Sequence, residues 1–522
     1  MNNIFPENSN TKPTVWTIAG SDCTAGAGIQ ADIKTMHNLG ADPSCVITAV
    51  TAQNHDNVLA INAVLEEVIQ SQISALIKVD TPKVIKIGLL ANARQVKLIA
   101  EQINQIKSNA ITKPYVIYDP VAIASNGGPL TEEDLLPAVK TLLLPLVDLI
   151  TPNKHELIAL TGICPQTWTC LQAASKKLLN LGVGASIIKG GHIDITENKS
   201  IDVYSSFSDS YWLSSNTILT DNSHGTGCTF SSAITVLLAQ GYLVRDAFVI
   251  AKAYINQGLN VAKKQTYKYA GVWQGGWPNN ISNYPEVLSI ESLLNNNPSK
   301  EPHSHSNRKA TNVSFPSCGT NKLGLYPVVD SLQWLQQLLQ LGIKTIQYRE
   351  KKLKGDKLSN AISQAVKLGE QYQARLFIND FWEYAIEHNA YGVHLGQEDL
   401  QTADLKAIKQ AGLRLGISTH GHYELLKALQ YKPSYIAIGA IFPTKTKDMT
   451  GQIQGLSTLK KLVQLTSNTP IVAIGGISLL NAKDVLMTKV GSIAVVTAIT
   501  RAENTDEAVK NFQQIIEQQL NE

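Results

Sequence analysis

The sequence has few cysteines, almost no net charge and no long apolar run, and each shortage excludes a class of protein. Its six cysteines are scattered through 522 residues without a Cys-x-x-Cys pair, which argues against a disulfide framework and predicts reduced thiols in a cytoplasmic protein. The 45 Lys and Arg nearly balance the 42 Asp and Glu, and a net charge of +3 predicts no nucleic-acid partner. Apolar stretches such as LLLPLVDLI are broken by Pro145 and Asp148 and fall short of the roughly 18 residues that cross a membrane, so no membrane partner is expected.

The length predicts more than one domain, because a single hydrophobic core rarely serves 522 residues. Residues 291–322 are polar, rich in Ser, Asn and Pro, and lack apolar periodicity, so they are expected to form a flexible linker. The predicted domains are therefore 12–290 and 323–522. His303 and His305 fall in the linker, where solvated side chains are expected rather than a metal site. The sequence leaves the oligomeric state open, including a homo-oligomer.

The first domain has the pattern of an α/β protein. Six apolar segments are predicted strands, and helical segments separate most of them: 15–21, 45–50, 84–90, 115–120, 149–153 and 185–191. This alternation predicts an open, mostly parallel sheet with helices on both faces. Residues 201–215 have the pattern of a hairpin instead.

A glycine-bearing turn, HGTGC, leads directly into an apolar periodic helix in this domain. The backbone N–H groups of Gly225 and Gly227 would converge at the helix N-terminus and form an anion site. Cys228 would lie in the first helical turn, where the pKa of a thiol tends to fall. The alternative is an ordinary loop–helix junction with a buried cysteine.

Three further groups of residues suit phosphoryl transfer. Asn153 and Glu156 follow a strand at a spacing that can hold hydrated Mg²⁺, although the same residues can cap a helix. Lys189 ends a strand where it could meet nucleotide phosphates. Asp32 follows a loop of small residues, and this loop lacks the GxxxxGK pattern of a P-loop.

Together these motifs resemble the hydroxymethylpyrimidine/phosphomethylpyrimidine kinase family, which has a ribokinase-like fold. The matching segments include AGSDCTAGAGIQADIKT, VITAVTAQN, KIGLLA, LITPN, IKGGH and HGTGC. The opening loop departs from the family's SDPSGGAG, since Cys23, Thr24 and Ala25 replace Pro, Ser and Gly. The resemblance implies an aminopyrimidine substrate and ATP as phosphoryl donor. It assigns substrate binding to Gln53, catalysis to Cys228, Asp32 and Lys189, and Mg–ATP binding to Asn153, Glu156, Gly225 and Gly227.

The second domain contains eight short apolar segments separated by helical ones, and this pattern predicts a (β/α)₈ barrel, also called a TIM barrel. Its active site would lie at the C-terminal strand ends. Gln347, Arg349 and Lys351 alternate along one strand and so share a face suited to a multiply charged anion. Asp380 and Asp399 follow neighbouring strands and could hold Mg²⁺ together. A solvated strand tip and a helix cap are the respective alternatives.

These segments resemble thiamine-phosphate synthase over 323–502 through QYREK, IND, GVHLGQED, GISTH, FPTKTK, AIGGI and VVTAI. The resemblance implies that Asp380 and Asp399 bind Mg²⁺. It assigns hydroxymethylpyrimidine diphosphate to Gln347, Tyr348, Arg349, Glu350, Lys351, Asn379, Ser418 and Lys447. It assigns the thiazole phosphate to Thr444, Lys445, Thr446, Gly476, Val496 and Thr497.

Since the product of the first domain would be the substrate of the second, the sequence predicts a bifunctional enzyme of thiamine biosynthesis. Two alternatives stay open. One is a pyridoxal-type kinase fused to a thiazole tautomerase barrel, and the other is a non-catalytic ligand sensor. A tautomerase barrel is expected to lack the QxRxK strand and the paired aspartates.

Overall fold

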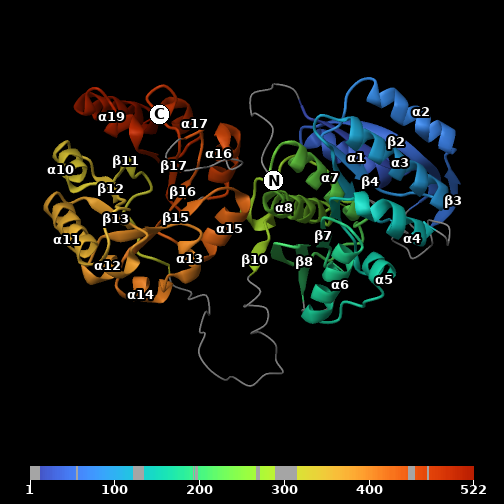
Figure 1. The fold of residues 1–522 in the computed structure, drawn as a ribbon, viewed down its shortest axis with the longest axis horizontal. Coiled ribbons are helices and arrows are strands. Elements are labelled where there is room, and N and C mark those ends of the chain that lie inside the picture. Colours follow the sequence, from blue (N-terminus) through green and yellow to red (C-terminus); the bar gives the residue numbers. More distant parts are fainter. Residues whose placement is uncertain are drawn as a thin grey trace, which may run out of the picture. The chain divides into compact units, whose positions relative to one another are not determined.

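The computed structural model describes residues 12–54, 57–121, 135–191, 193, 198–265, 271–288, 314–444, 453–466 and 469–521. The chain divides between Ser304 and His305 into two compact units, each of which has its own sheet (Figure 1). Most of the predicted linker, 291–313, lies outside the described residues. Within the described part of the chain, no helix is both long and apolar enough to span a membrane.

The first unit is built on one ten-stranded sheet with the order β10-β9-β8-β7-β6-β5-β4-β1-β2-β3. Its middle is parallel, whereas β3 and the β8–β10 edge pair antiparallel with their neighbours. The strands are β1 (Thr14–Asp22), β2 (Asp42–Gln53), β3 (Val58–Ala63), β4 (Val84–Ile87), β5 (Tyr115–Tyr118), β6 (Leu149–Ile150), β7 (Ala185–Ile188), β8 (Lys199–Ser206), β9 (Ser210–Asn216) and β10 (Glu286–Leu288).

Helices cover both faces of this sheet, because the central strands β4 to β7 are buried on both sides and need two apolar partners. One core contains the inward faces of α2, α3, α5 and α6, and α1, α7 and α8 pack together as the other layer. The helices are α1 (Gly28–Asn38), α2 (Glu66–Ile77), α3 (Ala93–Asn109), α4 (Leu135–Ala138), α5 (Lys154–Thr161), α6 (Trp168–Asn180), α7 (Thr226–Ala239) and α8 (Val244–Ala262). Short helical turns occupy Val139–Leu143, Leu144–Leu146 and Ile281–Asn283.

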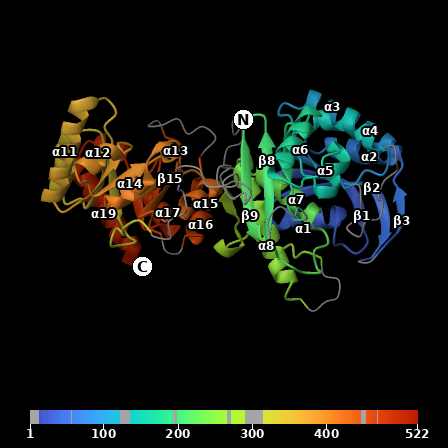
Figure 2. The same cartoon turned by 90° about the horizontal axis from the view of Figure 1, so that it is seen from below.

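The second unit is a closed barrel of eight parallel strands, with helices between them (Figures 1 and 2). The strands are β11 (Gly324–Val329), β12 (Thr345–Tyr348), β13 (Arg375–Asn379), β14 (Gly392–Leu395), β15 (Arg414–Thr419), β16 (Tyr435–Ile438), β17 (Ile471–Ile474) and β18 (Ser492–Val495). The helices are α10 (Leu332–Gln340), α11 (Gly355–Gln371), α12 (Trp382–Glu387), α13 (Asp399–Thr402), α14 (Leu405–Gln410), α15 (His422–Gln430), α16 (Gly455–Gln464), α17 (Ala482–Met487), α18 (Thr497–Thr500) and α19 (Thr505–Asn521).

Large aromatic side chains fill the barrel interior. Tyr326, Phe377 and Tyr435 are buried and meet edge-on or tilted, with ring centroids 4.9 to 6.0 Å apart. The inward-facing side chains of the strands fill the barrel interior, so there is no room for a substrate inside it. An active site is therefore expected at the strand ends.

The predicted fold class is confirmed in both units: an open α/β sheet and a closed (β/α)₈ barrel. All eight predicted barrel strands are present, and the predicted hairpin corresponds to the antiparallel pair β8–β9. The edge strands β3 and β10 were not predicted. In β3 most side chains are exposed on both faces, so its sequence shows no alternation between apolar and polar residues.

Candidate functional sites

Two glycine-bearing loops meet at the N-termini of α1 and α7. Gly225 has a φ of +80°, and a Cβ there would lie 1.8 Å from the backbone oxygen of Gly26. A side chain at position 225 would therefore push the opening loop away. His224 Nε2 lies 3.1 Å from a carboxylate oxygen of Asp22, which ties the same two loops together. A cavity of about 390 Å³ adjoins them, with Gly26, His224 and Lys34 in its lining.

Asp22 organises the opening loop that departs from the family pattern. Its carboxylate accepts the backbone N–H groups of Thr24 and Ala27, both at 2.8 Å. Burial alone would raise the pKa of Asp22, but hydrogen bonds from His224, Thr24 and Gln53 outweigh it and hold the pKa well below its usual value. The loop with Cys23, Thr24 and Ala25 thus surrounds the Asp22 carboxylate, which is charged at neutral pH. Gln53, at the end of β2, contacts this carboxylate.

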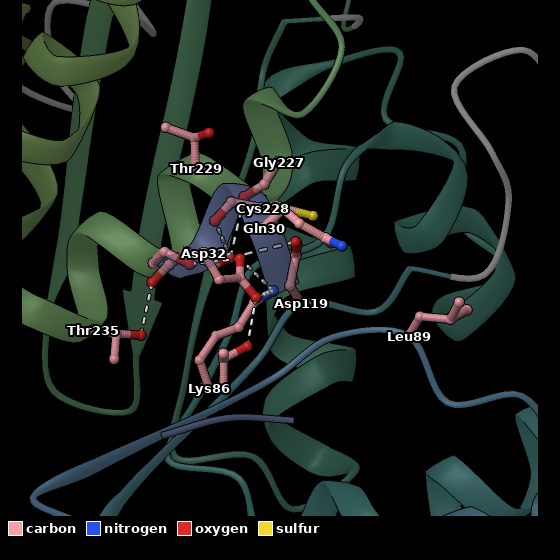
Figure 3. Close-up of polar contacts among 12 residues, drawn as sticks. Gln30, Asp32, Lys86, Leu89, Asp119, Gly227, Cys228, Thr229 and Thr235 are labelled. Atoms are coloured by element: carbon pink, nitrogen blue, oxygen red, sulfur yellow. Dashed lines mark hydrogen bonds and ion pairs between the residues drawn. The ribbon is translucent and has the colours of Figure 1, made fainter. Parts of the chain in front are cut away.

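Asp32 and Lys86 form an ion pair that is fully removed from solvent (Figure 3). The Lys86 ammonium lies 2.8 and 3.0 Å from the two carboxylate oxygens, and Ser232 donates a further hydrogen bond at 2.7 Å. Thr17 donates to the same carboxylate. The carboxylate that the sequence assigned to catalysis is thus buried and held by three donors from three elements.

Asp119 and Lys189 form a second ion pair at the carboxyl edge of the sheet. Lys189 Nζ lies 2.7 Å from Asp119 and 4.0 Å from Glu156. Burial opposes a charged lysine, but Asp119 and Glu156 outweigh this and raise the pKa of Lys189. Gly227 adjoins the pair, since a Cβ there would lie 3.3 Å from Lys189 Nζ. The cation is therefore fixed beside the start of α7.

Asn153 and Glu156 form a capping box at the start of α5. The Asn153 side chain accepts the Glu156 backbone N–H at 3.0 Å, and the Glu156 carboxylate accepts the Asn153 N–H at 2.7 Å. The helix-cap alternative is thus confirmed for both residues. Burial raises the pKa of Glu156, with Lys189 opposing and Asp119 adding to the rise.

The expectation that the pKa of Cys228 falls is wrong. Its thiol is buried in the first turn of α7, and burial raises its pKa to about 11. Lys86 lowers this pKa and the carboxylates of Asp32 and Asp119 raise it, so the net charge around the sulfur offers little help to a thiolate. Figure 3 shows the sulfur grouped with these three side chains. At neutral pH Cys228 is a neutral thiol that accepts the Gly28 N–H.

Asp380 and Asp399 come together at the rim of the barrel, as the sequence predicted. The two carboxylates lie near enough for Asp399 to act on the pKa of Asp380, and Lys351 Nζ lies 3.3 Å from Asp380. Burial and the neighbouring Asp399 raise the pKa of Asp380, and Lys351 partly offsets this. Two adjacent carboxylates of this kind suit a divalent cation, which would relieve their repulsion. The described residues contain no cluster of three or more His, Cys, Asp or Glu placed to hold a metal, so any Mg²⁺ here would take further oxygens from water or substrate.

Strand β12 ends at Tyr348, within the QYREK segment. The side chains of this segment therefore differ in their environments and contacts. Gln347 is buried and hydrogen-bonded to the interior Tyr326 and Tyr435. Glu350 accepts the backbone N–H of Lys352 at 2.6 Å and so shapes the loop. Tyr348 is buried, and its position next to Gln347 places it on the opposite face of the strand.

A chain of hydrogen bonds joins Ser418 at the rim to the barrel interior. His394 bonds to Ser418 Oγ at 2.8 Å through Nε2 and to Tyr435 OH at 2.7 Å through Nδ1. Tyr435 then meets Tyr326 at 2.7 Å. Burial and the nearby Arg349 lower the pKa of His394 to about 3, so the imidazole is neutral and orients Ser418 rather than carrying charge.

The loops after β16 and β17 meet at Gly476. Its φ is +66°, and a Cβ would lie 2.7 Å from Phe442 Cβ and from the Pro443 backbone oxygen. Val496 precedes α18, and Thr497 begins it with an exposed side chain. Thr444 follows Pro443 and is the last described residue of its loop. The predicted Lys445, Thr446 and Lys447 lie outside the described residues, whereas Asn379 ends β13 as a buried residue.

Sequence reasoning missed Lys86, Asp119 and His394. A lysine inside VIKIGLL should have indicated a buried ion pair, because a buried charge needs a partner. Asp119 follows the apolar strand β5, which is the same placement that identified Asp380 after β13. The hydrogen bonds of His394 could not be predicted, since no local sequence pattern indicates that His394 lies next to Tyr435.

Comparisons with known proteins match the two units separately. A family model described as phosphomethylpyrimidine kinase matches residues 22–273, and one described as thiamine monophosphate synthase matches residues 325–499. A thiamine-phosphate synthase of Citrobacter koseri is 58% identical over 187 residues, which are 36% of this chain and 89% of the relative.

The structural neighbours match the first unit. A phosphomethylpyrimidine kinase from Clostridium difficile 630 is 33% identical, with a TM-score of 0.41, and the match covers 47% of this chain and 99% of that one. A pyridoxal kinase from Staphylococcus aureus, solved with AMP-PCP and pyridoxal, is 28% identical, with a TM-score of 0.46 and coverage of 53% and 98%.

Proposed function

The chain belongs to the thiamine-phosphate synthase family through its C-terminal unit and carries a phosphomethylpyrimidine kinase domain before it. From this premise we propose a role for each group of site residues. The kinase unit phosphorylates hydroxymethylpyrimidine twice with ATP. The barrel then joins the diphosphate to thiazole phosphate, which yields thiamine phosphate and pyrophosphate. The contact between Lys351, Asp380 and Asp399 at the barrel rim supports this assignment most directly.

In the kinase unit we assign charge neutralisation to Lys189 and anion binding to the turn of Gly225 and Gly227. Phosphoryl transfer depends mostly on positioning and charge stabilisation. Lys189 is fixed by Asp119 beside Gly227, so its ammonium is preorganised where a phosphoryl group would meet the helix N-terminus. Gln53, at the end of β2 and in contact with Asp22, is assigned to the aminopyrimidine. Asn153 and Glu156 border the ATP side through α5.

Cys228 is proposed to shape this site as a neutral thiol. We expect Cys228→Ser to keep kinase turnover within about tenfold of the wild type, because a hydroxyl can also accept the Gly28 N–H. Cys228→Ala removes that acceptor and should lower turnover further. Initial rates of ADP formation measure both, and the coupling rate with supplied diphosphate is the internal control. A Ser variant as inactive as the Ala variant would restore a catalytic role for sulfur.

At the barrel rim, the chain's own residues hold a pyrophosphate leaving group. Arg349 and Lys351 neutralise its charge, and Asp380 and Asp399 are the residues that would hold Mg²⁺, which supplies further charge neutralisation when bound. Ser418, oriented by His394, and Asn379 are assigned to the aminopyrimidine diphosphate. Departure of pyrophosphate leaves a pyrimidine methylene cation, which the thiazole nitrogen attacks. No protein nucleophile is required for this bond.

The thiazole phosphate is assigned to the loops after β17 and β18, which barrels commonly use for phosphate, together with the loop after β16. Gly476 is exposed, and a side chain there would clash with Phe442 and Pro443, so this close approach of the two loops requires glycine. Val496 and Thr497 at the start of α18 complete this side, with Thr444, Lys445, Thr446 and Lys447 from the preceding loop.

The alternatives are weakened by particular residues. The synthase family match and the paired rim aspartates argue against a tautomerase barrel. The Lys189–Asp119 pair beside the glycine turn argues against a sensor that has lost its chemistry. All six cysteines carry free thiols, which supports the inferred cytoplasmic location.

Separation of the halves tests whether the sites are independent. Every proposed site residue falls within 12–290 or 323–522, and the two described units have separate sheets. We expect fragments 1–300 and 311–522 to keep kinase and coupling rates within about twofold of the full chain, because a tether changes only local concentration. Loss of either activity in a fragment that still shows native circular dichroism would contradict independence.

A further inference from the structure

The barrel has a polar cavity at the end opposite the proposed active site. It measures about 620 Å³, and its lining contains Lys344, Arg375 and Arg414. Arg375 and Arg414 are the first residues of β13 and β15, and Lys344 immediately precedes β12. Since the proposed catalytic residues follow the other ends of these strands, this cavity is separate from the barrel rim.

The backbone of the segment 317–318 fixes both guanidinium groups. Arg375 Nε donates to the Cys318 carbonyl at 3.1 Å, and Arg414 Nε donates to the Ser317 carbonyl at 3.2 Å. Arg414 also lies over the Tyr391 ring, 4.2 Å from its centroid. Each Arg thus uses its inner nitrogen for the backbone, and Arg375 also interacts with the Tyr391 side chain, so the remaining terminal nitrogens are the groups able to take a ligand.

The charge of the cavity is unbalanced. Among the described residues, none of Lys344, Arg375 and Arg414 forms an ion pair with a carboxylate, and the lining contains one acidic residue, Glu370. Lys344 Nζ donates instead to the Tyr372 carbonyl at 3.2 Å. Three cations and one carboxylate in a cavity of this size favour a multiply charged anion.

The remaining wall is apolar or uncharged. Val366, Leu376, Ala374 and Ala390 line it, together with Gly369. A ligand with a compact organic body and a phosphate group would match both walls, because specific polar groups in an otherwise apolar cavity are the usual form of a small-molecule site.

We propose that this cavity is a second ligand site, which binds an organic phosphate through Arg375 and Arg414. Such a compound could come from the chain's own reaction, as thiamine phosphate, or from the nucleotide pool, as ATP. The site does not depend on the assignment of the catalytic residues. A ligand in this cavity would contact the first residues of β13 and β15 and so stabilise the barrel at the N-terminal ends of its strands.

Calorimetric titration of the full chain in EDTA tests the proposal with three probes: inorganic phosphate, thiamine phosphate and ATP. We expect at least one probe to bind with an affinity that falls about tenfold or more in Arg375→Gln and in Arg414→Gln. Glu370→Gln should raise the affinity, because it removes the one carboxylate that opposes an anion. Lys460→Gln, an exposed lysine on α16, is the matched control and should leave binding unchanged.

The probe identifies the source of the ligand. Binding of thiamine phosphate points to a product of the chain, and binding of ATP points to a nucleotide. Since an Arg variant could disturb the segment 317–318, the surface change Glu370→Gln decides the matter independently of folding. The proposal is overturned if no probe shows a component sensitive to Arg375, Arg414 and Glu370, or if Lys460→Gln has the same effect as the Arg variants.

Discussion

Asp380→Asn is expected to lower the coupling rate about 100-fold or more at millimolar Mg²⁺ while the kinase rate stays unchanged. Asp380 and Asp399 are in contact at the barrel rim, and loss of one carboxylate removes a charge that a divalent cation needs. Metal-ion charge stabilisation contributes several kcal/mol to such steps, and about 1.4 kcal/mol corresponds to a factor of ten. Release of pyrophosphate from supplied hydroxymethylpyrimidine diphosphate and thiazole phosphate measures the effect.

Asparagine is chosen so that the substitution does not strain the backbone at position 380. Asp380 has a φ of +65°, a left-handed conformation that asparagine tolerates and alanine does not. Asp399→Asn should behave in the same way, and Asp506→Asn, an exposed residue in the first turn of α19, is the matched control. Near-normal coupling with unchanged Mg²⁺ dependence in either rim variant would reduce that residue to a helix cap or surface charge.

Lys86→Met is expected to destabilise the kinase unit by about 3–5 kcal/mol, because it leaves Asp32 as a buried charge without its cation. For a domain of this size, such a loss lowers the melting temperature by roughly 6 °C or more. Differential scanning calorimetry of the full chain measures it. The transition of the barrel serves as the internal reference, since Lys86 contributes nothing to that unit.

Asp32→Asn should restore part of the stability in the Lys86→Met background. The double variant has no buried charge at this position, and the single asparagine oxygen can still accept one of the two hydrogen bonds that Thr17 and Ser232 donate to different oxygens of Asp32. If the double variant is less stable than Lys86→Met alone, the carboxylate of Asp32 is stabilised by its other partners, and the ion pair is not the main source of stability.

The sequence predicts the barrel well because each of its strands is a short, mostly apolar segment followed by a polar or glycine-bearing turn. That regularity located Lys351, Asp380 and Asp399 at the rim and, for the same reason, Lys189 at the end of β7. Strand position is a local property, so a single sequence carries it.

Contacts between distant segments could not be predicted in this way. The pairing of Lys189 with Asp119, separated by 70 positions, depends on how β5 and β7 lie in the sheet. The helix dipole predicted a lowered pKa for Cys228. Burial of the thiol next to two carboxylates instead raises this pKa. Helix-cap geometry was correctly foreseen as an alternative for Asn153 and Glu156, because the capping box is itself a local pattern.

The most direct test of the account supplies the purified chain with hydroxymethylpyrimidine, Mg–ATP and thiazole phosphate and follows every species by mass spectrometry. The wild-type chain should form the monophosphate, then the diphosphate, then thiamine phosphate with pyrophosphate. The Asp380→Asn variant should stop at the diphosphate, which accumulates. Absence of thiamine phosphate in the wild type, or failure of Asp380→Asn to make the diphosphate, would contradict a chain in which two independent sites act in sequence.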